Sequence, residues 1–350
     1  MKEQKKRRFK LIDLERDGKG IGKNNNDSYD GLKRFFVTYK DNAGKLLSIN
    51  IFMVLGNFPL FFLVAVLSGY TKYQSFLPSS DFFQNLSSYF MLKEPSPYSM
   101  TLYALEGLPN QTLINSTWTY IFICISLLSL FTFGIVNVGT AYILRNIAKG
   151  DPIFIWSDFW YAVKRNLKQA LPFGAFDLLI NALLIYNIYL TLMGGSFATS
   201  LMFWLNIAVF IIYFFMRPYI YIQMVTFKLS VFKILKNSLS FALLGFKRNL
   251  LAFIGFCIAV LIEFTTLFAF GGLFVSAAVI FPLTIMFSSL AYMKVFASYF
   301  KIKTLMIDPY YEEHPELREN VVSEDVEVIM RDDVTEKERL EEIKRRNGII

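Results

Sequence analysis

The chain has 350 residues, of which 54% are hydrophobic and 18% charged, and its mean hydropathy is +0.41. Soluble domains carry about 25% charged residues, so this composition excludes a series of soluble domains and indicates a membrane protein. The formal net charge of +8 does not indicate nucleic-acid binding, because the basic residues flank apolar stretches instead of lining a polar face with interleaved aromatic rings.

The first segment, residues 1–45, is polar and contains 13 of the 36 Lys and Arg residues. It lacks the apolar core that a signal peptide needs close to its start, so we expect it to stay in the cytoplasm. A basic cluster lies near its beginning and comprises Lys5, Lys6, Arg7, Arg8 and Lys10. This cluster is either a contact for anionic lipid headgroups or a solvated tail.

Six apolar segments follow, each long enough to cross a hydrocarbon layer of about 30 Å as a helix. They comprise residues 46–67, 117–144, 171–193, 200–225, 250–270 and 273–299. Short glycine-containing turns join the third segment to the fourth and the fifth to the sixth. The predicted fold class is an all-α membrane protein in which residues 46–299 form about six transmembrane helices, arranged as three helical hairpins.

The distribution of basic residues predicts the orientation, because short loops rich in Lys and Arg remain cytoplasmic. The loops 145–170 and 226–250 hold five Lys and Arg each, and the stretch from Lys294 onward holds ten. Only Lys72 and Lys93 fall in segments predicted to lie outside. We therefore expect a multi-pass protein of the cell membrane with both termini in the cytoplasm.

Two segments outside the spans have a character of their own. The outer segment, about 68–116, is rich in Pro, Ser, Asn and aromatic residues and is expected to fold partly over the bundle. The C-terminal segment, 300–350, is charged and is predicted to lie in the cytoplasm, with a short helix at 335–346.

A tandem repeat is indicated by a Lys-X-Asn triplet that precedes three of the spans, at residues 40–42, 164–166 and 247–249. The second and third copies each lie 19 residues after a basic residue that ends the preceding span. Basic residues and Asn are also common at cytoplasmic helix ends, which is the alternative for the first copy. The connections before these triplets are expected to be amphipathic helices on the membrane surface, the first capped by Ser157 or Asp158.

Ionisable residues within the spans are costly, at about 3 kcal/mol each near the bilayer centre, so each requires a reason. Asp177 and Arg217 are both 20 residues from the turn at Phe197, which predicts matching depth and an ion pair. The pair either fixes the register of the hairpin or serves a substrate or a proton. The third alternative is that Arg217 extends unpaired to the inner headgroups.

Glu263 lies nearer the outer half of the fifth span, with no basic residue at its level. It is either protonated or directed into a polar cavity. With Asn181 and Asp177 it would line a proton-coupled pathway, whereas Asn181 alone would be an ordinary hydrogen-bonding contact between helices. Asp177, Arg217, Glu263 and Asn181 are therefore the candidate polar site.

Three sequence motifs resemble the YesL-like family of bacterial integral membrane proteins, whose domain has no assigned function. They are Gly139–Asn146, Phe154–Trp160 and Lys164–Ala170. The likeness is specific over 131–171, looser across the other helices, and absent from the outer segment and the C-terminal tail. The motif residues of the cytoplasmic loop are Arg145, Asp158, Phe159, Lys164, Asn166 and Gln169.

The resemblance implies a bundle of six or fewer helices in the cytoplasmic membrane of a Gram-positive bacterium. Members of the family often occur beside carbohydrate uptake systems of the ABC type, which implies an accessory or scaffold role with permease subunits as partners. The alternative is a small-solute transporter or channel that uses Asp177, Arg217 and Glu263.

An enzyme is not expected, because no nucleophile and base stand at a sensible spacing. Cys124 and Cys257 lie inside apolar runs and His314 in the polar tail, so no metal site and no cofactor are predicted.

Overall fold

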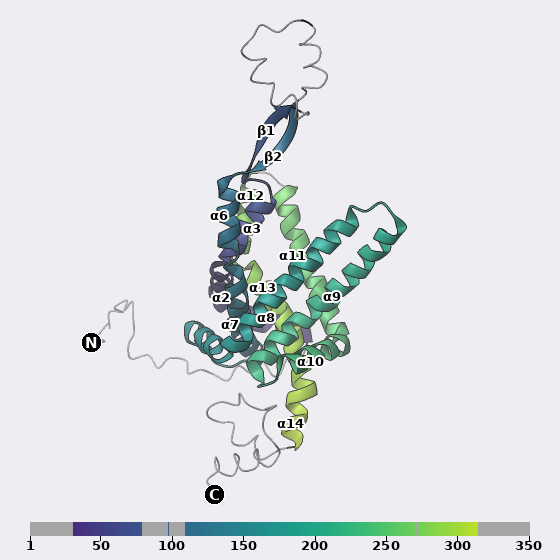
Figure 1. Cartoon of the computed structure of the whole chain (residues 1–350). Helices are drawn as coiled ribbons and strands as arrows, with labels where there is room; N and C mark the ends of the chain where they lie inside the picture. The colour runs from purple at the N-terminus through teal and green to yellow at the C-terminus, as the bar shows by residue number, and fades with distance from the viewer. Residues whose placement is uncertain (1–30, 79–96, 98–108, 270–271, 314–350) are drawn as a thin grey trace, which may run out of the picture.

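The computed structural model describes residues 31–78, 97, 109–269 and 272–313. Within this part of the chain the fold is helical apart from one two-stranded sheet (Figure 1). Five helices are long and apolar enough to cross a membrane, or six if one bent pair counts as a single span. The prediction of a helical, multi-pass membrane protein is therefore confirmed at this level. The basic cluster near Lys5 and the tail helix at 335–346 lie outside the described residues.

The first predicted span is two helices. After α1 (Gly31–Asp41), α2 (Ala43–Gly56) and α3 (Phe58–Leu67) form a pair bent by 56°. Pro59 stands in the first turn of α3, where a missing backbone N–H is tolerated but the ladder of the preceding helix cannot continue. The bend therefore follows from the position of one proline.

The outer segment contains a β-hairpin that the sequence analysis did not predict. Strand β1 (Lys72–Pro78) pairs antiparallel with β2 (Pro109–Asn115), with Lys72 opposite Asn115 and Pro78 opposite Pro109. Figure 1 shows the two strands projecting from one end of the helical bundle. The expectation that this segment folds over the bundle is wrong for these residues.

Three long helices make the central part of the fold. Helices α6 (Thr117–Ser126) and α7 (Ser129–Lys149) together form one apolar span. Helix α8 (Ile155–Leu192) runs unbroken through the predicted surface connection and the predicted third span, because Pro172 is accommodated inside it. The first connection is therefore not a separate helix. At the other end of the hairpin, Ser196 and Thr199 form a capping box that begins α9 (Phe197–Thr226).

The second connection is a helix of its own, α10 (Val231–Leu244), which is followed by α11 (Phe246–Phe268). The last predicted span is longer than expected and continues past Tyr299 to Glu313. It comprises α12 (Leu273–Phe281), the π-helical turn η2 (Pro282–Met286), α13 (Phe287–Ile302), the π-helical turn η3 (Lys303–Ile307) and α14 (Asp308–Glu313).

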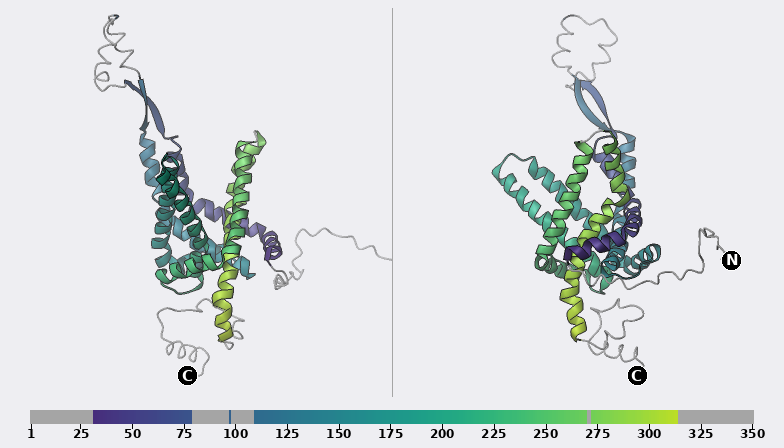
Figure 2. Two further views of the ribbon diagram at one scale, coloured as in Figure 1. Left: turned by 90° about the vertical axis from the view of Figure 1, so that its right-hand side faces the viewer. Right: turned by 180° about the vertical axis from the view of Figure 1, so that it is seen from behind.

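The buried core lies in the half of the bundle opposite the β-hairpin. Helix α7, the first half of α8, the second half of α9 and α13 supply most of its residues. In contrast, the distal halves of α8 and α9 and nearly all of α11 expose large apolar side chains, and Figures 1 and 2 show the α8–α9 hairpin extending away from the other helices. Such surfaces are stable in contact with lipid and not with water.

Aromatic side chains mark two levels along the bundle. Tyr70 and Trp118, beside the β-hairpin, are 90% and 62% exposed, and Trp156 at the start of α8 is 67% exposed. Tyr and Trp are enriched at membrane–water interfaces, because an amphipathic ring there contacts lipid with its apolar part and water with its polar group. The two levels agree with a bilayer normal that runs along α6 and α7.

Candidate functional site

The centre of the candidate site is the Asp177 carboxylate, which is completely buried in α8. Four side chains donate hydrogen bonds to it. Oδ1 accepts from Tyr213 Oη at 2.7 Å and from Asn181 Nδ2 at 2.8 Å, whereas Oδ2 accepts from Tyr221 Oη at 2.6 Å. Arg217 Nε lies 2.9 Å from Oδ1 and 3.0 Å from Oδ2. The predicted ion pair is confirmed, and Asn181 belongs to the same cluster.

Helix geometry explains how one carboxylate obtains so many partners. Tyr213, Arg217 and Tyr221 are four residues apart on α9, so they lie on one face of that helix. Asp177 and Asn181 have the same spacing on α8. The two faces meet because α8 and α9 are joined by the short turn before Phe197, from which Asp177 and Arg217 are equally distant. Tyr213 and Tyr221 were not predicted to belong to the site, although their spacing of four residues from Arg217 indicates that they share its helix face.

The number of donors determines what this carboxylate can do. A buried carboxylate is stable only when its lone pairs are occupied by hydrogen bonds or by a paired charge. Asp177 has both, and two of its donors are tyrosines that are at least nine-tenths buried. The arrangement therefore suits a structural cross-link between α8 and α9.

A second cation, Lys294 on α13, lies close to this cluster. Its Nζ is 4.9 Å from the centre of the Phe214 ring and 5.7 Å from that of Phe256. Phe214 is three residues before Arg217 on α9, so Lys294 lies about one helical turn from the ion pair. Lys294 was expected to be one of the cytoplasmic basic residues, because the depth of a residue on α13 relative to Arg217 on α9 cannot be read from the sequence.

Glu263 is not part of the cluster. It lies half-buried on α11, and within the described part of the chain it has no hydrogen bond or ion pair. The structure therefore does not bring Glu263 together with Asp177, Asn181 and Arg217.

Two of the six motif residues, Arg145 and Gln169, lie at a second cluster, where α9 ends and the connection to α10 begins. Arg145 Nη1 donates to the carbonyl of Val225 and to Thr226 Oγ1, at 3.3 and 3.0 Å. Arg165 also donates to the Val225 carbonyl, and Gln169 Nε2 donates to the carbonyl of Leu229 at 3.0 Å. The last carbonyls of a helix carry partial negative charge and lack intrahelical partners, so two guanidinium groups stabilise this end.

Three other motif residues have local roles. Asp158 Oδ2 accepts from the backbone N–H of Phe154 at 2.9 Å, but Phe154 is the N-cap residue and α8 begins at Ile155, so the prediction that Ser157 or Asp158 caps its start is wrong. Asn166 Nδ2 donates to the carbonyl of Ala162 in its own helix at 2.9 Å. Lys164 is exposed.

Contact with Phe159 explains why position 139 of the motif is glycine. Its ring is 4% exposed and stacks on Phe52 with a centroid distance of 4.6 Å. A Cβ on Gly139 would overlap this ring, so α7 requires glycine at the contact. The Gly134 and Gly174 backbones also touch, which lets α7 and α8 cross closely, as small residues do in membrane bundles.

In two of the three repeated triplets, the Asn side chain makes the same kind of hydrogen bond. Asn42 and Asn166 each donate to the carbonyl four residues earlier, in Thr38 and Ala162, at 2.9 Å. Asn249 instead donates to the carbonyl of Ala242 at 3.0 Å, across the junction of α10 and α11. Tyr219 Oη donates to Asn249 Oδ1 at 3.0 Å.

A buried asparagine that the sequence analysis missed spans the π-helical turn η2. Asn50 on α2 is fully buried, its Nδ2 donates to the carbonyl of Pro282, and its Oδ1 accepts from the backbone N–H of Ser288, each at 2.9 Å. These are backbone groups that a π-turn displaces from the regular ladder. Asn50 therefore joins α2 to the irregular part of the last span.

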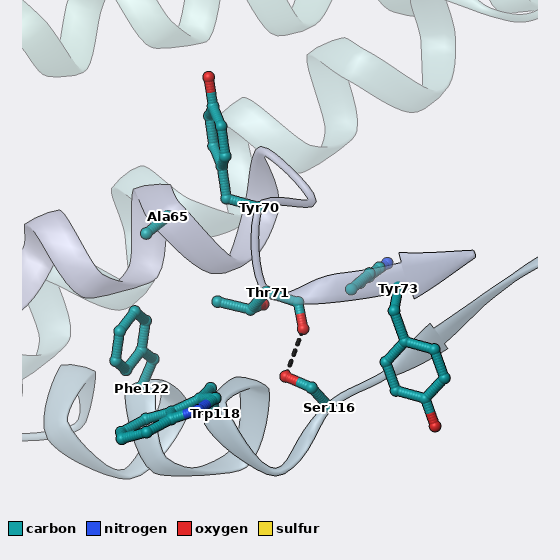
Figure 3. Close-up of a pocket in the computed structure, with 8 residues that line it drawn as sticks. Ala65, Tyr70, Thr71, Tyr73, Ser116, Trp118 and Phe122 are labelled. Carbon is teal, nitrogen blue, oxygen red and sulfur yellow. Dashed lines mark hydrogen bonds between the residues drawn. The ribbon is translucent and has the colours of Figure 1, made fainter. Parts of the chain in front are cut away.

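An open pocket of about 530 Å³ lies at the base of the β-hairpin (Figure 3). Tyr70, Tyr73, Trp118 and Phe122 contribute aromatic surface to it. Of its lining residues, Ser116 donates its hydroxyl to the Thr71 carbonyl, which also accepts from Thr119 Oγ1 of α6 at 2.9 Å. The pocket is thus mainly an aromatic surface at the base of the β-hairpin.

Among the described residues, no three His, Cys, Asp or Glu side chains come together as a metal site would require. Comparison with known protein families, curated proteins and solved structures finds no match to this chain. The interpretation of the site therefore depends on its own geometry.

Proposed function

We propose that this protein is a non-catalytic accessory or scaffold component of the bacterial cell membrane, associated with carbohydrate uptake of the ABC type. In this proposal six spans form three helical hairpins, both termini lie in the cytoplasm, and permease subunits are the partners. The resemblance of Gly139–Asn146 and Phe154–Trp160 to the YesL-like family supports the link with carbohydrate uptake.

The observation that carries the scaffold role is the saturated Asp177 carboxylate. Four donors from two helices surround it. Arg165 and Gln169, in the first half of α8, also donate to the carbonyls of Val225 and Leu229, at the end of α9 and just after it. These contacts hold the α8–α9 hairpin in one register. A surface that binds another membrane protein needs such a fixed register.

Affinity purification tests the proposal directly. A tagged protein is extracted from its native membrane in a mild detergent, and co-eluting proteins are identified by mass spectrometry. We expect permease subunits of a carbohydrate ABC transporter in stoichiometric amount, and their loss when Arg217→Gln disturbs the hairpin. A tagged, unrelated six-span protein at equal expression is the control. Elution without any permease subunit would contradict the scaffold role.

A second candidate function is a small-solute transporter or channel. Glu263 favours it, because this carboxylate on a membrane helix has no hydrogen-bonding partner in the described structure, and ionisable groups at such positions often serve a transport pathway. Solute or proton flux through the purified protein in liposomes, abolished by Glu263→Gln, would support this function over the first.

A further inference from the structure

The cluster around Asp177 contains two basic side chains. Arg217 is paired with Asp177, Lys294 lies over Phe214 three residues before Arg217 on α9, and among the described residues Asp177 is the one carboxylate that contacts either of them. Arg217 uses only its Nε on that carboxylate, and its side chain remains 20% exposed. Among the described residues, the Nη groups of Arg217 and the ammonium of Lys294 have no hydrogen-bond acceptor.

Aromatic rings lie beside both basic side chains. Lys294 Nζ lies over Phe214, one turn before Arg217 on α9, and over Phe256 of α11, and these two rings are 5.0 Å apart. The Arg217 guanidinium lies 5.3 Å from the centre of the Phe133 ring of α7. Cation–π contacts orient a cation but do not neutralise it.

The depth of the cluster limits which anion can reach it. Arg217 precedes Val225, near the predicted cytoplasmic end of α9, by about 12 Å of helix. A bilayer accommodates Arg and Lys at such depth by local thinning, with phosphates and water drawn toward the cations. An inner-leaflet phosphate can therefore approach these groups more readily than a solute from the opposite side.

We propose that Arg217 and Lys294 form a binding site for the phosphate of an anionic phospholipid of the inner leaflet. The guanidinium Nη groups and the ammonium donate to the phosphate oxygens, and Asp177 keeps Arg217 oriented through Nε. A lipid with net negative charge balances the excess positive charge, whereas a zwitterionic lipid does not. The proposal is independent of any role in carbohydrate uptake.

The test is lipid binding by the full-length protein in a neutral detergent, measured by native mass spectrometry and by the shift of thermal unfolding. Dioleoyl phosphatidylglycerol is titrated against dioleoyl phosphatidylcholine, with inorganic phosphate as a third arm. Lys294→Met is the main variant, because Met keeps the length of the side chain between two aromatic rings but removes its charge. Lys301→Met is the matched control, two turns further along α13 and also half-buried.

We expect phosphatidylglycerol to bind wild type and Lys301→Met alike, and Lys294→Met about tenfold or more weakly, the effect of one charge-assisted hydrogen bond. Lys294→Arg retains the cation and should restore the preference, even if Lys294→Met folds poorly. Equal binding of the two lipids by the wild type, or an unchanged affinity in Lys294→Met, would overturn the proposal. Protection by inorganic phosphate at the same concentrations would assign the site to a soluble anion and overturn the lipid assignment.

Discussion

The ion pair between Asp177 and Arg217 predicts strong coupling between two substitutions. Arg217 Nε lies 2.9 Å from Asp177 Oδ1, and the Asp177 side chain has no exposed surface. Removing one partner of a buried ion pair costs about 3–5 kcal/mol. We expect about 3 kcal/mol for Asp177→Asn and for Arg217→Gln, at the lower end of the range of a buried pair, because Arg217 is partly exposed.

The double variant distinguishes a direct pair from two independent residues. If the pair is direct, Asp177→Asn with Arg217→Gln loses about 4 kcal/mol instead of the sum of about 6, a coupling of about 2 kcal/mol. The free energy of unfolding is measured in mixed micelles by denaturant titration, with tryptophan fluorescence and circular dichroism as readouts. Lys168→Gln, an exposed charge on the same helix, is the control. Additive losses would refute a direct role of this ion pair in fixing the α8–α9 register.

Three further predictions use the same measurement of unfolding. Gly174→Ala places a Cβ against the Gly134 backbone and should cost about 1–3 kcal/mol as overpacking, whereas Gly44→Ala, which meets nothing within 4 Å, should cost nothing. Asn50→Leu removes the hydrogen bonds to the part-buried Pro282 carbonyl and the buried Ser288 N–H, so a loss of about 2–3 kcal/mol and faster hydrogen exchange at Ser288 are expected. Asn57→Leu, whose hydrogen bond stays within one turn of chain, should show neither effect. Gln169→Ala should cost about 1 kcal/mol and make the connection at Phe227–Leu229 more susceptible to protease; unchanged cleavage would show that the bond to the Leu229 carbonyl does not hold this segment.

Hydrophobicity and residue spacing predicted the features that depend on one or two helices. The apolar runs identified the spans, and the equal distances of Asp177 and Arg217 from one turn predicted their contact, because two helices joined by a short turn must run side by side. Arg145 and Gln169 were identified through a sequence resemblance. Their partners, the carbonyls of Val225 and Leu229, could not be predicted, since any backbone carbonyl is an equivalent acceptor.

Features that depend on three or more helices were not predictable in this way. Lys294 joins Arg217 only because α13 packs against α9, and Asn50 reaches the π-helical turn η2 only because α2 packs beside it. Neither packing contact has a signal in hydropathy or periodicity. The β-hairpin was missed for a different reason: Lys72–Pro78 and Pro109–Asn115 are more than thirty residues apart, so no local turn signal connects the two strands.

The geometry of Asp177 separates the two candidate functions. A carboxylate that carries a proton or binds a substrate must exchange partners, and at Asp177 that exchange requires the loss of hydrogen bonds from Tyr213, Tyr221 and Asn181 as well as the ion pair. Because three of these four donors are on α9, transport through Asp177 would require α8 and α9 to move apart. A scaffold requires the opposite, since its surface must persist between encounters with a partner. The observed saturation of the carboxylate therefore favours the scaffold, and a transport pathway, if one exists, is better sought along α11 at Glu263.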